Sequence, residues 1–274
     1  MKKIDAKKIL STIILFLFAL IWLVPILWLI GKAFTPEQII YKEGYKIIPS
    51  SFTLKNITQI FDSWPFMRWF YNSLLVTIGA ILLTSLTAIM AGFSFARLHW
   101  KGRNFVFLLF LSSMFIPWEI NAIPLYFIMN FFGLLNTRVG VFLPMVAMPI
   151  GVFLMRQFLI NIPQELEDAA RIDGCGSVRL LFRILLPLSL PAVGALTIWI
   201  FIFAWNEFFW SMISLQKAAM LTMPIGLKTI MGSQSIEYGI LFGASMLALI
   251  PSLVIFAVLR KKIISGISIS GAIK

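Results

Sequence analysis

A charged stretch at residues 161–187 interrupts the otherwise apolar second half of the sequence. Within it, Pro163 suits the first turn of a helix and Gly174 is a natural helix terminator. These signals predict one helix over residues 163–173 and a second over residues 177–187. The stretch therefore predicts a helix, a turn and a helix that project from the apolar part of the chain.

The chemistry open to the first of these helices is the docking of another surface. Glu165 and Glu167 would place negative charge near the positive end of the helix dipole. The residues that follow at helical spacing are Leu166, Ala169, Ala170 and Asp173. Because the two alanines are small, another surface could approach them closely. We expect a contact site for a partner; a solvated helix that merely joins its neighbours is the plainer alternative.

Polar side chains also interrupt two apolar runs. Asn206 and Glu207 stand within one of them, and Glu119 and Asn121 lie between two prolines in the other, where we expect a kink. Asn206, Glu207 and Asn121 are therefore candidates for lining a path through a membrane. Hydrogen bonding between helices, or a place at the lipid headgroups, would explain Asn206 and Glu207 equally well.

Patterns for bond-making chemistry are absent from the sequence. It contains no Gly-x-x-x-x-Gly-Lys-Ser/Thr phosphate loop, no His-Glu-x-x-His pair and no Gly-x-Ser-x-Gly elbow. The single histidine, His99, has no second ligand at metal-binding spacing, and Cys175 is the only cysteine. We expect no enzyme activity, no metal site and no cofactor in this chain, so any ATP would be bound by another chain.

The elements that must position these residues are long apolar runs. Of 274 residues, 60% are hydrophobic and 12% are charged. A helix needs about 20 apolar residues to cross a bilayer core, because lipid offers the backbone no hydrogen-bond partner. Six stretches meet or approach that length: residues 9–30, 71–95, 105–127, 139–159, 188–213 and 239–259. The predicted fold is all-α, a polytopic membrane protein with six transmembrane helices.

Charge and loop length predict the topology. The net charge is +12, and most Lys and Arg residues fall in the segments that share a side with both termini. By the positive-inside rule both termini are expected in the cytoplasm, and nucleic acid is not needed to explain the charge. Without a linker, residues 1–274 should form one domain. Residues 33–70 form an outer loop, a surface for a partner or a packed loop without one, and residues 160–187 form a cytoplasmic loop.

The charged stretch resembles the cytoplasmic signature of membrane permeases of bacterial ABC importers. That signature reads Glu-Ala-Ala, three residues, Gly, nine residues, Ile-x-Leu-Pro. Here Asp-Ala-Ala stands at residues 168–170, Gly174 follows after three residues, and Ile-Leu-Leu-Pro stands at residues 184–187. Asp168 departs from the usual Glu, which keeps the charge but shortens the side chain by one methylene.

Further segments are similar to the second permease subunit of maltose-type and glycerol-phosphate-type transporters. They are residues 72–74, 91–97, 123–126, 133–137, 205–208 and the tail 271–274. The resemblance therefore covers nearly the whole chain and implies the type I ABC importer permease fold.

This resemblance implies a set of roles and partners. Residues 163–176 would be a coupling helix seated in a groove of an ATPase subunit. The coupling residues would be Glu165, Glu167, Asp168, Ala169, Ala170, Asp173 and Gly174. Two ATPase subunits would bind ATP, a second, homologous permease would complete a heterodimer, and an extracytoplasmic binding protein would deliver a sugar or oligosaccharide. The location implied is the bacterial inner membrane.

Two alternatives stay open. The solute could be another small molecule, such as glycerol phosphate or an amino acid. The chain could also be an ion-coupled secondary transporter that works alone, although the internal repeats and paired membrane carboxylates typical of that class are not found in the sequence.

Overall fold

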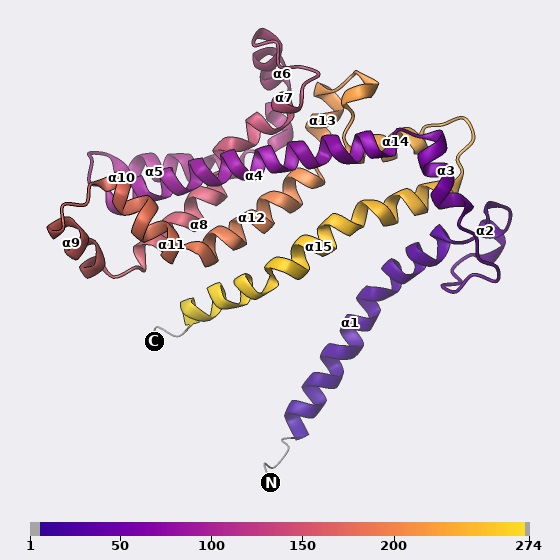
Figure 1. Cartoon of the computed structure of the whole chain (residues 1–274), viewed down its shortest axis with the longest axis horizontal. Helices are drawn as coiled ribbons and strands as arrows, with labels where there is room; N and C mark the ends of the chain where they lie inside the picture. Colours follow the sequence, from indigo (N-terminus) through magenta and orange to yellow (C-terminus); the bar gives the residue numbers. More distant parts are fainter. Residues whose placement is uncertain (1–5, 272–274) are drawn as a thin grey trace. The chain divides into compact units, whose positions relative to one another are not determined.

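The computed structural model describes residues 6–271 of the chain, and over that range it is all-helical (Figure 1). The last three residues of the tail at 271–274 lie outside the described residues. The helices group into two compact units. One unit holds the chain up to Met67 together with Gly226–Ile250, and the other holds Arg68–Ile225 and the segment from Pro251 onward. The single domain over residues 1–274 stays a prediction.

Three helices are long and apolar enough to cross a membrane unaided. They are α1 (Ala6–Ala33), α4 (Phe66–Arg97) and α15 (Tyr238–Gly271). They contain the first, second and sixth predicted spans. Three pairs of shorter helices pass the same test only together, so that six spans result if each bent pair counts as one. The all-α prediction is confirmed.

The bent pairs break beside prolines. Arg103–Phe115 and Trp118–Phe131 meet at 96°, Arg138–Ala147 and Pro149–Ile160 at 45°, and Ser177–Leu188 and Leu190–Trp205 at 80°. Because proline lacks a backbone N–H and its ring clashes with the preceding turn, each break falls where the regular hydrogen-bond ladder cannot continue. The kink predicted in the third span is confirmed.

The shorter helices include the halves of these bent pairs. They are α5 (Arg103–Ser112), α6 (Ala122–Phe131), α7 (Arg138–Phe142), α8 (Pro149–Ile160), α9 (Gln164–Ile172), α10 (Ser177–Leu180), α11 (Leu186–Leu188), α12 (Leu190–Trp205), α13 (Phe209–Ser214) and α14 (Met223–Met231). Two sequence predictions need correction. The spans at 139–159 and 188–213 are not continuous: the first bends before α8, and in the second α12 ends at Trp205, before the separate helix α13.

In the first unit, side chains bind the outer segment to the neighbouring helix ends. The segment folds into α2 (Glu37–Glu43) and α3 (Lys55–Ser63). The Asn56 side chain donates to the carbonyls of Ala33 and Thr35 at 3.0 and 2.8 Å. The Glu37 carboxylate accepts from the backbone N–H groups of Tyr238 and Gly239, which begin α15. The predicted loop at 33–70 is thus an ordered segment.

A second acidic residue of this segment is held in its charged form. The backbone N–H of Ser50 donates to the Glu43 carboxylate at 2.7 Å, and Lys32 Nζ lies 3.8 Å from it. The hydrogen bond from Ser50 is the main reason why the pKa of Glu43 lies below its ordinary value.

In the second unit, α4 packs closely on α8. A Cβ atom at Gly92 would lie 2.7 Å from Met155 Cβ and 3.0 Å from the Arg156 nitrogen. Met155 and Leu159 of α8 are fully buried in the core of this unit. Glycine at 92 therefore permits a helix approach that a side chain would prevent.

The two ends of this unit differ. α9 projects from the end where α4 finishes and α5 begins, whereas α6, α7 and α13 gather away from it (Figure 1). Residues at the ends of α6, α7 and α13 are therefore not neighbours of α9.

We predict that Gly92→Val destabilises the chain by about 1–3 kcal/mol, because the added atoms collide with backbone of α8 that cannot move aside. Reversible unfolding in mixed detergent micelles measures this. Gly176→Val is the matched control, since the space around Gly176 is open and its φ of −73° suits any residue. Equal stability of the two variants would contradict the close packing of α4 on α8.

Candidate functional site

The helix predicted over residues 163–173 is present as α9. Pro163 precedes its first residue with φ −55° and ψ 135°, and Gly174 follows it with φ +77°. The N–H of Gly174 donates to the Arg171 carbonyl, and the N–H of Cys175 donates to the Ala170 carbonyl at 2.9 Å. This pair of bonds is the glycine-dependent stop of a Schellman motif, which confirms Gly174 as the terminator.

An ion pair attaches the inner face of α9 to the end of α4. Arg97 Nε lies 2.5 Å from Glu167 Oε1, and the two side chains are only 9% and 1% exposed. Charges buried this deeply persist only when they are paired, and removing one partner is costly. The last residue of α4 thereby holds the fourth residue of α9.

The same guanidinium also holds the turn that leads into α9. Arg97 donates to the carbonyl oxygens of Leu159 and Ile162, and to Gln164 Oε1 at 3.0 Å. These acceptors lie at the end of α8 and the start of α9, so one arginine joins three helices. Because a guanidinium presents five donors in a rigid plane, it can satisfy several acceptors that a lysine could not.

Sequence reasoning did not single out Arg97. Lys and Arg residues served there only to predict the topology, and Glu165 and Glu167 were given one common role at the helix dipole. In the structure Glu165 is exposed, whereas Glu167 is buried against α4. A signal was present, since Arg97 ends the segment 91–97 that resembles importer permeases, but sequence spacing alone does not reveal a contact 70 residues away.

The two alanines of α9 also separate. Ala170 is 7% exposed and packs into the core of the unit, while Ala169 is exposed. Ala170 therefore packs α9 against its own chain, and a coupling role for it stays a prediction. The predicted residues that are exposed on α9 and its end are Glu165, Leu166, Asp168, Ala169, Asp173 and Gly174.

Exposed apolar side chains accompany these residues. Ile172 is 86% exposed and Leu166 is 46% exposed, both on α9. Val178, on α10 just beyond the turn, is 72% exposed. A projecting helix with apolar side chains beside acidic ones has the composition of a protein contact surface.

The second helix of the charged stretch begins at Ser177 as predicted but contains a π turn at Leu181–Leu185. Pro187 cannot donate to the carbonyl four residues earlier, and the N–H of Leu186 bonds to Leu181, five residues back. Leu180, Leu181 and Leu185 are buried in the core of the unit. The base of the projecting loop is thus anchored by packing.

Glu207 lies at the bend between α12 and α13. It is 7% exposed, and its carboxylate accepts from the N–H groups of Trp210 and Ser211 at 2.7 and 2.8 Å and from the Ser211 hydroxyl. These bonds satisfy the first backbone N–H groups of α13. They also explain why the Glu207 carboxylate can be buried, without any contact to a solute. Among the explanations that the sequence left open for Glu207, hydrogen bonding within the protein has this support.

Asn206 and Asn121 are both exposed. The Asn206 amide donates to the Ile202 carbonyl one turn back, and Asn121 begins the helix after the kink at Pro117. Nothing in the structure brings Asn206 and Asn121 onto α9. Within residues 6–271, no three His, Cys, Asp or Glu side chains are grouped closely enough to hold a metal ion.

Known proteins resemble this chain along most of its length. It is 37% identical to the arabinooligosaccharides transport system permease protein AraQ of Halalkalibacterium halodurans over 92% of both chains. It is 33% identical to AraQ of Bacillus subtilis, covering 96% of this chain and 95% of that one. The diacetylchitobiose uptake system permease protein DasC of Streptomyces coelicolor is 30% identical over 91% of both chains.

The fold is also known. A chain in the crystal structure of a bacterial ABC transporter involved in the import of the acidic polysaccharide alginate superposes with a TM-score of 0.83 at 19% identity, covering 95% of this chain and 99% of that one. Residues 85–265 match the model of one family, which includes α9 and both of its anchors, Arg97 and Leu180. The chain belongs to the binding-protein-dependent transport system inner membrane components, the multi-pass permeases of ABC transporters.

Proposed function

We propose that this chain is the permease subunit of an ABC importer for a sugar or an oligosaccharide. The observation that carries the proposal is its 37% identity, along nearly its whole length, to a permease named for arabinooligosaccharides. Relatives named for diacetylchitobiose and for lactose extend the same chemistry to other short sugars. The chain would form half of the translocation pathway beside a second, homologous permease, and an extracytoplasmic binding protein would deliver the solute.

An ATPase subunit would bind the exposed face of α9. Both termini of the chain would lie on the same, cytoplasmic side. Asp168 and Ala169 lie on that face, and Ile172 offers an apolar side chain for a groove. ATP would be bound by two ATPase subunits. Closure of these subunits around ATP would draw two such helices together and favour an outward-open pathway.

Force can pass from α9 to the membrane helices only if α9 is rigidly attached. Arg97 supplies that attachment on one side through Glu167, and the buried Leu180, Leu181 and Leu185 supply it on the other. A loosely joined helix would move with the ATPase without tilting the spans. Arg97 and Glu167 are therefore positioning residues for coupling.

Asn206 and Asn121 are proposed to line the pathway, because both are exposed polar residues at the ends of apolar helices. Glu207 is a weaker candidate, since its carboxylate is already engaged by α13.

The test of the function is the transporter reconstituted in vesicles with its partner permease, its ATPase subunits and its binding protein. We expect arabinooligosaccharides, diacetylchitobiose or lactose to raise ATP hydrolysis several-fold through the binding protein, and an amino acid or glycerol phosphate to have no effect. Stimulation by the latter solutes alone would reject the sugar assignment. Accumulation driven by an ion gradient without ATP would reject the importer.

We predict that Arg97→Gln and Glu167→Gln each abolish most of the solute-stimulated ATP hydrolysis. Each leaves a buried charge without its counter-charge, at a cost of about 3–5 kcal/mol, and so weakens the attachment of α9 to α4. Hydrolysis and uptake are measured together in vesicles. Arg183→Gln, which removes an exposed charge from the same cytoplasmic loop, is the matched control.

The double variant Arg97→Glu with Glu167→Arg restores the pair in reverse and should recover part of the coupling. If both single variants retain full stimulation, α9 does not depend on this attachment. If they lose membrane insertion as well, only the recovery by the double variant supports a role in coupling.

We predict that Glu207→Gln lowers stability by about 1–3 kcal/mol and leaves solute preference unchanged, because an amide cannot accept all three hydrogen bonds and buried donors of α13 stay unsatisfied. Thermal unfolding in detergent and competition between sugars in uptake measure the two effects. Glu119→Gln, at an exposed carboxylate, is the control. A changed solute preference at normal stability would instead place Glu207 in the pathway.

A further inference from the structure

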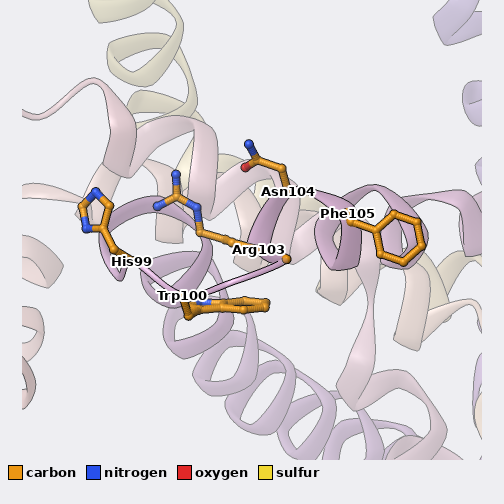
Figure 2. Close-up of a pocket in the computed structure, with 6 residues that line it drawn as sticks. His99, Trp100, Arg103, Asn104 and Phe105 are labelled. Atoms are coloured by element: carbon orange, nitrogen blue, oxygen red, sulfur yellow. The ribbon is translucent and has the colours of Figure 1, made fainter.

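A pocket of about 290 Å³ lies in the turn between α4 and α5 (Figure 2). It is lined by His99, Trp100, Gly102, Arg103, Asn104 and Phe105. His99 is thus a loop residue, as the sequence predicted, and it is exposed. Neither the coupling site nor the polar residues at the helix breaks use this pocket.

The turn has a defined conformation. Gly102 adopts φ +83°, a left-handed conformation that favours glycine, and its carbonyl accepts from the N–H of Val106. The Arg103 guanidinium donates to the Leu98 carbonyl at 2.9 Å, which holds the side chain over the turn. In the view of Figure 2, His99, Arg103 and Asn104 extend to one side of the loop. A cation, an imidazole and an amide that line the pocket therefore lie on one side of the loop in this view.

The cations around the pocket are not neutralised by the protein. Among the side chains that the structure describes, no carboxylate lies within ion-pair distance of Arg103, Lys101 or Arg156. Arg156 instead places its guanidinium 4.2 Å from the centre of the Phe107 ring and donates to the Phe95 carbonyl. An anion from outside the chain would supply the missing negative charge.

Exposed aromatic residues adjoin this charge. Phe105 is 71% exposed at the start of the apolar helix α5, and Trp100 is 39% exposed in the turn. Aromatic residues at this position are typical of the boundary between membrane and water. The ligand that suits a cationic pocket with an apolar edge has an anionic head and an apolar tail.

We propose that this pocket binds the phosphate of an anionic phospholipid, such as phosphatidylglycerol, from the leaflet on the α9 side. The phosphate would contact Arg103, His99 and Asn104, and an acyl chain would pass along Phe105. The side is set by Arg97, two residues before His99, which is bonded to α9. The proposal rests on the proposed cytoplasmic position of α9, where anionic lipids attract basic segments, and it does not depend on which solute is transported.

The test uses the complete transporter, purified in detergent, stripped of lipid and incubated with phosphatidylglycerol or phosphatidylcholine of the same acyl chains. Native mass spectrometry counts the lipids retained, and the melting temperature is measured with each. We expect Arg103→Gln to reduce the retention of phosphatidylglycerol about fivefold, the weight of one interfacial cation, without changing that of phosphatidylcholine. Arg179→Gln, an exposed arginine on α10 outside the pocket, should retain the lipid.

Because Arg103 also bonds to Leu98, a second variant protects the test against loss of the turn. Asn104→Asp adds a negative charge to the pocket and removes no cation. It should therefore reduce the retention of phosphatidylglycerol, while the melting temperature without lipid stays unchanged. Equal losses in Arg103→Gln and Arg179→Gln would overturn the proposal in favour of diffuse charge attraction.

Two other outcomes would also overturn it. Inorganic phosphate that raises the melting temperature as much as phosphatidylglycerol would make the pocket a site for free anions. Unchanged lipid retention in Arg103→Gln with loss of the ATPase subunits would make it a protein contact. Failure of the sugar importer would appear separately, as absent stimulation by sugars with lipid retention intact.

Discussion

In lipid every backbone N–H and C=O group needs a hydrogen-bond partner within the protein. Three candidate spans of this chain are broken helices, and at each break some of these groups lose their partner within the helix. Side chains from neighbouring helices replace the bonds lost at the breaks. Thr84 and Thr87 of α4 donate to the carbonyls of Met145 and Val146, just before the bend into α8. Glu207 accepts the free N–H groups at the start of α13. The bend before α8 and the start of α13 are therefore each supported by specific polar side chains.

Side-chain hydrogen bonds of this kind also join elements that are distant in the sequence. The Trp210 indole of α13 donates to the Gly140 carbonyl of α7 at 2.9 Å. At the start of α4, the Asn72 amide donates to the carbonyls of Ala219 and Leu221, and its oxygen accepts from Arg138. These bonds attach the start of α4, and the helices α7 and α13, to other parts of the unit.

The projecting helix α9 is connected to the supported part of the unit through α4. The end of α4 carries Arg97, and the same helix supports the bend before α8 through its two threonines. Arg97 thereby attaches α9 to the longest helix of the second unit. A coupling device needs both features, a surface that another subunit can hold and a stiff connection to the pathway.

The sequence by itself determined the apolar spans, the kink at Pro117 and the helix that ends at Gly174, because these depend on local properties: run length, a missing N–H and a positive φ. It also placed the signature residues of α9. Tertiary structure alone decided which face of α9 is free, since Glu167 is buried against Arg97, 70 residues before it in the chain, and Ala170 is buried in the core of the unit. The partners of Arg97 and Glu207 were decided in the same way, because the fold determines which groups surround a buried charge.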